Sequence, residues 1–528
     1  MRVLLAQTTP FLTHRSWNYV EHLGLGFLEK ALDDHGFSVD VLDATLDWRD
    51  SAFITAGAFS SDEPYALIGF SVNASNFPST VDTIRALRQG GFLGHITLGG
   101  HFPTFHHGKI LQTFPEVDSV VLGHGECTLV RLVECLSSGT SWNEVPGLAY
   151  IASGGQVWET PCYENEVFLK TVGIPFHRPL YGIARMITSR GCSRHCAFCS
   201  VNSFDRHNFK NHYLRRDLME VLEEVDLLVG KHGVRHIWLS DMDFIGTDKG
   251  FIRHFCEEIV RKQYRLTLEG DCRVDELDEP LVALLARAGF NCIYFGVESF
   301  VPRQLLAYTK FSPEFDARSR VISAVDLLRK HDIIPRFGFI MFDKDSTMEE
   351  LRLNHEVISA TVGYGTLDSL ATKLALLPGT KIELEYLKDA RNCWQVPITA
   401  ENRLQPHLYY TQYRFVDTWV SLVYEISFSY RNKFQRLQQL FDEELRANRI
   451  TYSQHWRALW KMRDLFGDIY GEILQIAGAS LTPPFFPPEV SDRLDDLLIR
   501  FCEGLGFARE RVRSILQAEK ECPGEPYP

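Results

Sequence analysis

Short β-rich runs alternate with helical patterns along the first quarter of the chain. Between the first two runs, Leu23, Phe27 and Ala31 repeat at helical spacing, and Gly36 follows as a helix stop. Alternation of this kind is typical of a parallel sheet with crossover helices, so we predict a doubly wound, Rossmann-like α/β domain over residues 1–145. Its strands are expected at 2–6, 39–42, 66–72, 95–98 and 119–122.

A second alternating series begins near residue 184, after a hairpin and linker that we predict at 146–183. This series gives about six βα units, fewer than the eight of a complete TIM barrel, so we predict a partial (β/α)6 barrel over 184–385. The expected strands are 185–188, 235–239, 265–269, 292–295, 336–340 and 369–376.

The pattern becomes helical after Pro378-Gly379-Thr380, and no further strand series is recognisable in the sequence. We therefore predict a helical C-terminal domain over 386–528, with a stiff proline connector at 483–488. Its helices are expected at 413–430, 432–446, 455–477 and 490–501.

Charge balance and hydropathy limit the partners of this 528-residue chain. Its 68 Asp and Glu outnumber 55 Lys and Arg, for a net charge of −13, so there is no general positive field for nucleic acid. No run approaches the ~20 apolar residues of a membrane span, and the first apolar run is too short for a signal peptide. We expect a cytoplasmic protein that binds neither nucleic acid nor membrane and keeps its 12 cysteines reduced.

Small and polar residues follow four of the predicted N-terminal strands. In an open parallel sheet, ligands bind beyond the carboxyl ends of the strands, where the connecting loops offer backbone amides. Any one of these loops could serve only as a tight turn, but four loops in register favour a binding site. We predict that this site includes Gln7, Thr8, Ser71, Asn73, Ser75, Gly99, Gly100, His101, Gly123, His124, Gly125 and Glu126.

The tight cysteine cluster of the chain consists of Cys192, Cys196 and Cys199. Three thiolates from one short loop suit an iron–sulfur cluster. A structural zinc ion would need a fourth ligand at a short regular spacing, and His195 is badly placed for this because it adjoins Cys196. A four-iron cluster held by three cysteines keeps one iron open to an external amino and carboxylate group.

These cysteines, with the aromatic Phe198 before the last of them, resemble the radical S-adenosylmethionine (SAM) motif, which lies beyond the first strand of a partial barrel. The resemblance covers about the first 385 residues. It is closest to the cobalamin-binding subfamily, whose lead domain is similar to residues 98–101, 117–121 and 123–126 of this chain. The resemblance implies a 4Fe–4S cluster ligated by the three cysteines, SAM and cobalamin, with Phe198 among the residues that border the cofactors.

The chain departs from this subfamily at two places. A Glu is usual between the two glycines where His124 stands here. The Asp-X-His-X-X-Gly sequence that supplies a lower axial histidine in some cobalamin proteins is absent from the region of 71–76. We therefore expect cobalamin to bind without that histidine.

Within the barrel, the resemblance implies further contacts to SAM. Asp241 and Asp243 lie where the family approaches the methionine amino group, although residues at a strand end also cap helices. Glu298, in a Gly-X-Glu-Ser sequence, is expected to meet the ribose or methionine part of SAM. Arg273 and Arg336 are candidate partners of the methionine carboxylate, or else members of structural ion pairs.

The resemblance implies that reductive cleavage of SAM produces a radical that attacks an unactivated carbon. We predict a cobalamin-dependent radical SAM methyltransferase that C-methylates a small molecule, such as a specialised metabolite, with a flavodoxin or ferredoxin as electron donor. Radical cyclisation, ring contraction or another rearrangement with the same cofactors is an open alternative. More distant alternatives are a corrinoid-binding sensor without catalysis and a zinc-stabilised interaction module.

Overall fold

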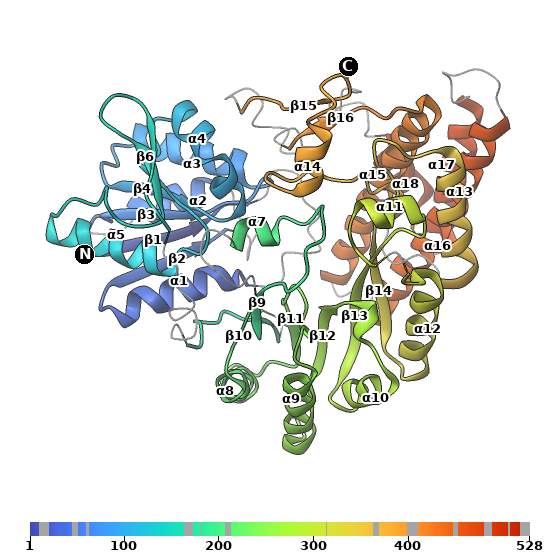
Figure 1. Cartoon of the computed structure of the whole chain (residues 1–528), viewed down its shortest axis with the longest axis horizontal. Coiled ribbons are helices and arrows are strands. Elements are labelled where there is room, and N and C mark those ends of the chain that lie inside the picture. Colours follow the sequence, from blue (N-terminus) through green and yellow to red (C-terminus); the bar gives the residue numbers. More distant parts are fainter. Residues whose placement is uncertain are drawn as a thin grey trace.

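A computed structural model gives the arrangement of most of the chain (Figure 1). It describes residues 1–9, 21–44, 51–59, 63–162, 173–180, 182–205, 213–312, 314–362, 369–398, 410–446, 452–479, 488–504 and 507–517. The predicted proline connector at 483–488 lies outside the described residues except for Pro488. In the described helices, no segment is long and apolar enough to cross a membrane.

The N-terminal domain is built on a seven-stranded sheet in the order β2-β1-β3-β4-β5-β6-β7. Its first five strands are parallel, which confirms the predicted doubly wound core, and β6 and β7 extend it as an antiparallel hairpin. The strands are β1 Arg2–Gln7, β2 Ser38–Asp43, β3 Leu67–Ser71, β4 His95–Gly99, β5 Ser119–Val121, β6 Leu148–Ile151 and β7 Val157–Glu159.

Helices cover both faces of this sheet, as the alternation of strands and helices requires. Leu4 belongs to one apolar cluster and its neighbour Leu5 to the other, because successive strand side chains point to opposite faces. The first cluster includes side chains of α2 Ser51–Phe59, α3 Phe77–Gln89 and α4 His101–Thr113. The second includes side chains of α1 Leu23–Asp34 and α5 Glu126–Ser138.

The central domain is a partial barrel whose five strands are parallel, in the order β14-β13-β12-β11-β8. The strands are β8 Ile183–Met186, β11 His236–Leu239, β12 Thr267–Cys272, β13 Phe290–Glu298 and β14 Ile334–Phe339. The outer helices are α8 Leu218–Gly230, α9 Lys249–Lys262, α10 Glu279–Arg287, α12 Ala317–Lys330 and α13 Met348–Val357.

The prediction of a regular sixth strand at 369–376 is wrong. Residues Ser369–Ala371 form a single 3-10 turn, and the segment joins the sheet through one bridge between Phe342 and Lys373. Leu370 and Leu374 are buried nevertheless. A short apolar run indicates burial, and burial alone does not distinguish a strand from an irregular segment.

The C-terminal region is mainly helical, as predicted, but its details differ. The two helices expected at 413–430 and 432–446 are one continuous helix, α15 Thr418–Arg446. A small antiparallel pair, β15 Cys393–Trp394 and β16 Gln412–Tyr413, precedes it and was not predicted. The other helices are α14 Lys381–Tyr386, α16 Tyr452–Ala479, α17 Pro488–Gly504 and α18 Arg509–Gln517.

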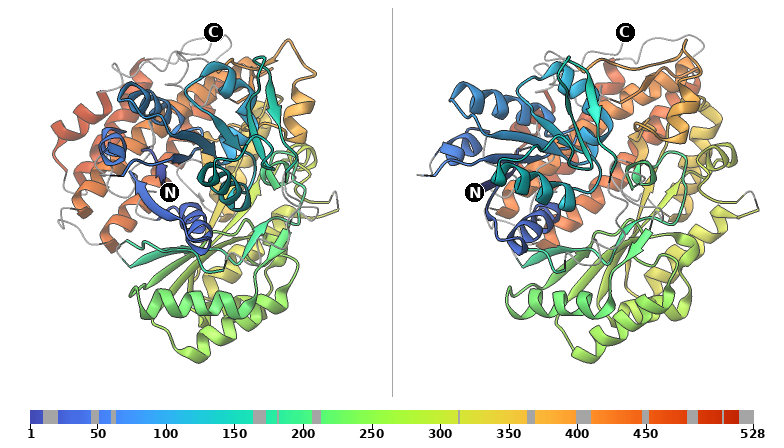
Figure 2. Two further views of the ribbon diagram at one scale, coloured as in Figure 1. Left: turned by 90° about the vertical axis from the view of Figure 1, so that its left-hand side faces the viewer. Right: turned by 60° about the vertical axis from the view of Figure 1, so that its left-hand side comes forward.

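The barrel and the C-terminal helices share one apolar core. Phe434 of α15 and Phe466 of α16 belong to the same cluster of buried side chains as Leu351 of α13. In Figure 1 these helices and the N-terminal domain lie on opposite flanks of the barrel, and in the left view of Figure 2 the N-terminal domain faces the viewer. The boundary at 385/386 stays a prediction, as do the other domain limits.

A buried charge network joins the N-terminal domain to the barrel. The imidazole of His177, in the linker, donates from Nδ1 to Glu21 Oε1 at 2.9 Å and from Nε2 to Glu224 Oε1 at 3.1 Å, and its side chain is fully buried. Arg216 adds a contact of 2.6 Å to Glu224 Oε2. Burial opposes the charged imidazole, but the two carboxylates outweigh it and raise the pKa of His177 to about 9.

This network predicts a pH-dependent contribution to stability. Because the pKa of His177 is raised above its usual 6.5, the stabilisation is complete below pH 6.5 and is lost as the pH rises through about 9. A shift of this size corresponds to a free energy on the order of 3 kcal/mol. We expect the melting temperature of the wild type to fall between pH 6.5 and 9.5 more steeply than that of His177→Gln. His254→Gln, which changes an exposed histidine on α9, should keep the wild-type slope, and equal slopes in all three proteins would contradict the prediction.

Candidate active site

The three predicted cluster ligands lie in a short loop between the barrel and the N-terminal domain. The loop follows β9 Ser189–Gly191, which pairs with β10 Tyr213–Arg215, and leads into the short helix α7 Val201–Asp205. Gly191 has φ +74°, a left-handed conformation that favours glycine immediately before Cys192. All three thiols are free and partly exposed, so they are accessible to a ligand.

The cysteine loop is not closed around a single metal position in this structure. A tetrahedral zinc ion, with Zn–S bonds of about 2.3 Å, needs its thiolates within about 4 Å of one another. Across the described residues, no group of three His, Cys, Asp or Glu side chains could hold a single metal ion. Burial raises the pKa of Cys192 to about 11 and also raises the pKa of Cys199, so metal binding must displace their protons.

Two buried aspartates beyond the end of β11 have different partners. Asp241 accepts hydrogen bonds from Thr188 N at 3.0 Å, Thr188 Oγ1 at 2.7 Å and Ser189 Oγ at 2.5 Å. These bonds fix the positions of Thr188 and Ser189, shortly before the cysteine loop. Asp243 Oδ1 accepts from Gly246 N at 3.0 Å. Its buried Oδ2 has no hydrogen-bond donor in the described part of the chain. Of the two predicted ammonium acceptors, Asp243 is thus the one that keeps an oxygen available to a ligand.

Glu276 lies against Asp243 and was missed by the sequence analysis. Burial, followed by the charge of Asp243, raises the pKa of Glu276 to about 8. Arg194 Nη2 donates to Glu276 Oε1 at 3.0 Å. The raised pKa favours the neutral form of Glu276 at pH 7, and a cationic ligand bound beside the two carboxyl groups would favour its ionised form.

Glu298 is held in an unusual backbone conformation at the end of β13. Its φ is +68°, and the pairing of β13 with β14 shifts register between Gly296 and Glu298. The carboxylate turns back to receive Lys310 Nζ at 3.0 Å. A Cβ atom at Gly296 would lie 2.1 Å from Glu298 Oε1 and 2.6 Å from Lys310 Nζ, so the pair can keep this position only with glycine there and would have to shift otherwise.

Lys310 is a second residue that the sequence analysis missed. Its side chain is 9% exposed, and its ammonium group lies near the cysteine loop. Burial opposes the charge, but Glu298 and then Cys196 outweigh it and raise the pKa of Lys310. The only local signal is a lysine that follows Glu298 by twelve residues, and the pairing itself depends on the fold.

Arg273 and Arg336 are both engaged with other protein groups. Arg273 Nε donates to Asp275 Oδ1 at 2.9 Å, and its Nη2 donates to the Lys310 carbonyl at 2.9 Å. Arg336 Nη1 lies 3.8 Å from Glu269 Oε2. These contacts agree with the structural ion-pair alternative for each arginine. Phe198, the remaining predicted barrel residue, meets Tyr308 edge to face at a ring distance of 5.7 Å.

A cavity of about 240 Å³ opens at the carboxyl end of the N-terminal sheet. It reaches between the strands and helices α1 and α5, where Leu5, Leu25 and Leu129 supply apolar walls. Eight predicted residues line it, namely Ser71, Gly99, Gly100, His101, Gly123, His124, Gly125 and Glu126.

The other four predicted loop residues do not line this cavity. Thr8 Oγ1 lies 2.7 Å from Thr80 Oγ1, and Asn73 Oδ1 accepts from the Ser75 amide, so these side chains hold the loops themselves. Gln7 is buried. His22, which was not predicted, contacts Ser71 Oγ at 3.1 Å and caps α1 through the Leu25 amide.

The rim of this cavity contacts both flanks of the cysteine loop. Arg190, two residues before Cys192, pairs with Glu126 at 2.7 Å. After the loop, Asp205 lies 3.0 Å from His124 Nε2. The rings of His101 and Phe204 stack at 3.8 Å with an interplanar angle of 7°. The cavity and the cysteine loop are therefore neighbours in one site, with α7 between the two domains (Figure 1).

Comparisons with known proteins agree with this arrangement. Residues 186–356 match the family model of the radical SAM superfamily, and residues 12–133 match that of the B12 binding domain. The anaerobic magnesium-protoporphyrin IX monomethyl ester cyclase of Synechocystis sp. is 28% identical over 323 residues, which cover 59% of this chain and 62% of the cyclase. The match thus spans less than two thirds of that relative.

Two further similarities concern a methyltransferase and a solved structure. The cytidylyl-2-hydroxyethylphosphonate methyltransferase of Streptomyces wedmorensis is 23% identical over 362 residues, which cover 58% of this chain and 67% of that protein. The structure of OxsB, a cobalamin-dependent SAM radical enzyme, with aqua-cobalamin and SAM bound, has a TM-score of 0.67 at 19% identity. That similarity covers 98% of this chain and 78% of OxsB, and it shows a shared fold.

Proposed function

Because the chain is a radical SAM protein with an N-terminal B12-binding domain, we propose that it C-methylates an unactivated carbon of a small molecule. The radical SAM domain implies a 4Fe–4S cluster and SAM, and the B12-binding domain implies cobalamin. The observation that carries the proposal is the direct contact between the cavity rim and the cysteine loop, through the Arg190–Glu126 and His124–Asp205 pairs. Cofactors bound at the two sites would share one reaction chamber.

The residues beside the cysteine loop fit a cluster with SAM bound. Cys192, Cys196 and Cys199 would hold three of the four irons. Asp243, whose Oδ2 lacks a donor among the described residues, would receive the ammonium group of SAM, and that cation would favour the ionised form of Glu276 beside it. Glu298 would receive hydroxyl or amine donors of SAM, and the contact with Lys310 Nζ holds that carboxylate in place.

We propose that the cavity binds the nucleotide tail of cobalamin, which is a flat apolar group with a polar edge. Its deep walls are leucines, and its rim is made of glycines. Gly100 has φ +108°, and a Cβ there would lie 2.6 Å from the Val72 carbonyl. We propose that His101 and His124 approach the corrin from this rim. Residues 71–76 contain no histidine, so we propose that cobalamin binds without a lower axial histidine from that region.

The chemistry of the cofactors defines the reaction. When bound, the reduced cluster supplies the electron that cleaves SAM, and cobalamin supplies the methyl group. The protein orients the cofactors and excludes water from them. We propose a flavodoxin or ferredoxin as electron donor and a cytoplasmic location, where the free thiols stay reduced.

Both the methylation and its alternative have support among the relatives. One relative is named a methyltransferase and the other a cyclase, and each name refers to a small-molecule substrate. Radical cyclisation or another rearrangement is therefore the second candidate.

The proposal is tested on protein purified and reconstituted without oxygen. Iron and cobalt contents are measured first, followed by formation of 5′-deoxyadenosine from SAM and a reductant. Candidate small molecules are then incubated with SAM that carries a deuterated methyl group. A product that gains the deuterated methyl supports methylation, and a product of altered structure without it supports rearrangement. Protein that binds neither iron nor cobalt would refute both candidates.

A further inference from the structure

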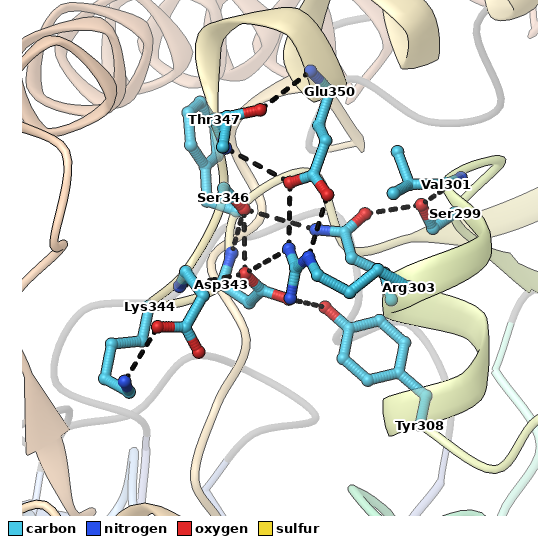
Figure 3. Close-up of polar contacts among 12 residues, drawn as sticks. Ser299, Val301, Arg303, Tyr308, Asp343, Lys344, Ser346, Thr347 and Glu350 are labelled. Atoms are coloured by element: carbon cyan, nitrogen blue, oxygen red, sulfur yellow. Dashed lines mark hydrogen bonds and ion pairs between the residues drawn. The ribbon is translucent and has the colours of Figure 1, made fainter.

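A polar network lies beyond the carboxyl ends of β13 and β14 (Figure 3). At its centre is Arg303, on the short helix α11 Pro302–Ala307. Its Nε and Nη2 donate to Glu350 at 2.8 and 2.9 Å, and its Nη2 and Nη1 donate to Asp343 at 3.0 and 3.2 Å. A guanidinium paired with two carboxylates, each through two bonds, is fixed in both position and orientation.

Both carboxylates are fixed independently of Arg303. Asp343 is 1% exposed and accepts a hydrogen bond from Ser346 Oγ at 2.9 Å. Glu350 forms a capping box with Thr347 at the start of α13, with bonds of 3.1 and 3.2 Å. Arg303 therefore fastens α11 to a rigid part of the barrel.

The network continues into Tyr308, directly after α11. Its hydroxyl group donates to Asp343 Oδ2 at 3.2 Å, and the side chain is fully buried. Its carbonyl accepts from the Ala197 amide at 2.8 Å, and its ring meets Phe198 edge to face. Tyr308 thus spans from the anchored Asp343 to the residues between the second and third cysteines.

The next residue contacts the cysteine loop at a second point. Thr309, with φ +49°, donates its Oγ1 to the His195 carbonyl at 3.0 Å. Within the loop, the Cys199 amide donates to the Cys196 carbonyl at 3.2 Å. On the far side, the Ile382 amide donates to the Ala197 carbonyl at 3.0 Å. Much of the shape of the loop is therefore set by segments outside it.

We propose that Arg303, Asp343 and Tyr308 are positioning residues that hold the cysteine loop in the geometry needed by a cluster with one open iron. None of the three lines the N-terminal cavity, and they act on the cysteine loop through the Tyr308–Thr309 turn. The inference rests on the proposed function in one respect, namely that the cysteine loop binds an iron–sulfur cluster. Groups that orient metal ligands without binding the metal typically change affinity or activity by about 10- to 100-fold.

The test compares variants of the full chain, reconstituted without oxygen. Tyr308→Phe removes one hydroxyl group and keeps the ring, and Arg303→Met removes both carboxylate pairings. We expect Tyr308→Phe to keep its iron but to show altered electron paramagnetic resonance g values of the reduced cluster with SAM bound. Its kcat for SAM cleavage should fall about 10-fold, and its KM for SAM should change less. Arg303→Met should lose more activity, and Arg303→Lys should recover part of it.

Arg88→Met is the matched control in the N-terminal domain. Arg88 pairs with Asp118 at 2.6 Å and donates to three backbone carbonyls, far in the fold from the cysteine loop. This variant should melt at a lower temperature but keep the wild-type spectrum. The inference is overturned if Tyr308→Phe has the wild-type spectrum and rate, or if Arg303→Met and Arg88→Met lose iron equally. Wild-type protein that binds no iron would instead refute the proposed function.

Discussion

Cys196→Ala is expected to abolish SAM cleavage and to deplete the protein of iron. With two ligands left in the loop, the cluster loses a third of its protein bonds, and the open iron that receives SAM is no longer positioned. Removal of a group that is essential to the chemical step lowers kcat by at least about 10⁴-fold. The measurements are iron content and the rate of 5′-deoxyadenosine formation in protein reconstituted without oxygen.

The matched control for this variant is Cys135→Ala. Cys135 is also a free, partly buried cysteine, but it lies on α5 of the N-terminal domain. It should keep the wild-type iron content and rate. Full iron content and unimpaired cleavage in Cys196→Ala would contradict the assignment of the loop as the cluster site.

Gly296→Ala is expected to weaken SAM binding and to lower kcat/KM for SAM cleavage by about 100-fold, which is the cost in rate of a displacement of about 1 Å at a reacting centre. The added Cβ would lie 2.1 Å from Glu298 Oε1 and 2.6 Å from Lys310 Nζ, so the ion pair must move. The three cysteines are not touched, so iron content should stay near the wild-type value. Titration of SAM into the reconstituted protein measures the change in affinity directly.

Gly230→Ala provides the control within the same barrel. It lies at the end of α8, and an added Cβ there meets no atom within 4 Å. Its affinity for SAM and its melting temperature should match the wild type. Wild-type affinity in Gly296→Ala would show that Glu298 does not contact SAM.

The features that sequence reasoning predicted best are those encoded locally. The cysteine spacing lies within eight residues, and the alternation of strands and helices defines the doubly wound sheet and the partial barrel. Eight of the predicted loop residues line one cavity because the carboxyl ends of parallel strands meet at one edge. The prediction of a sixth strand was wrong because the apolar residues of 369–376 are buried without regular strand pairing.

The features that sequence reasoning missed depend on contacts between distant segments. Glu276 becomes a candidate site residue only through its contact with Asp243, and Lys310 only through its ion pair with Glu298. Neither pair corresponds to a recognisable sequence motif. Asp241 and Asp243 were equivalent candidates in the sequence, and the hydrogen bonds from Thr188 to Asp241 distinguish them. Arg303 gave no signal, because its partners lie 40 and 47 residues away.

The Arg190–Glu126 pair has a consequence for the assembly of the holoprotein. Glu126 belongs to the rim of the cavity, and Arg190 stands two residues before Cys192, the first of the three proposed cluster ligands. A ligand that favours one position of Glu126 also favours one position of Arg190, so occupancy of either site changes the free energy of filling the other. By thermodynamic linkage this coupling is equal in both directions. The loading of the two proposed cofactor sites would then be a cooperative equilibrium, in which each bound cofactor changes the retention of the other by the same factor.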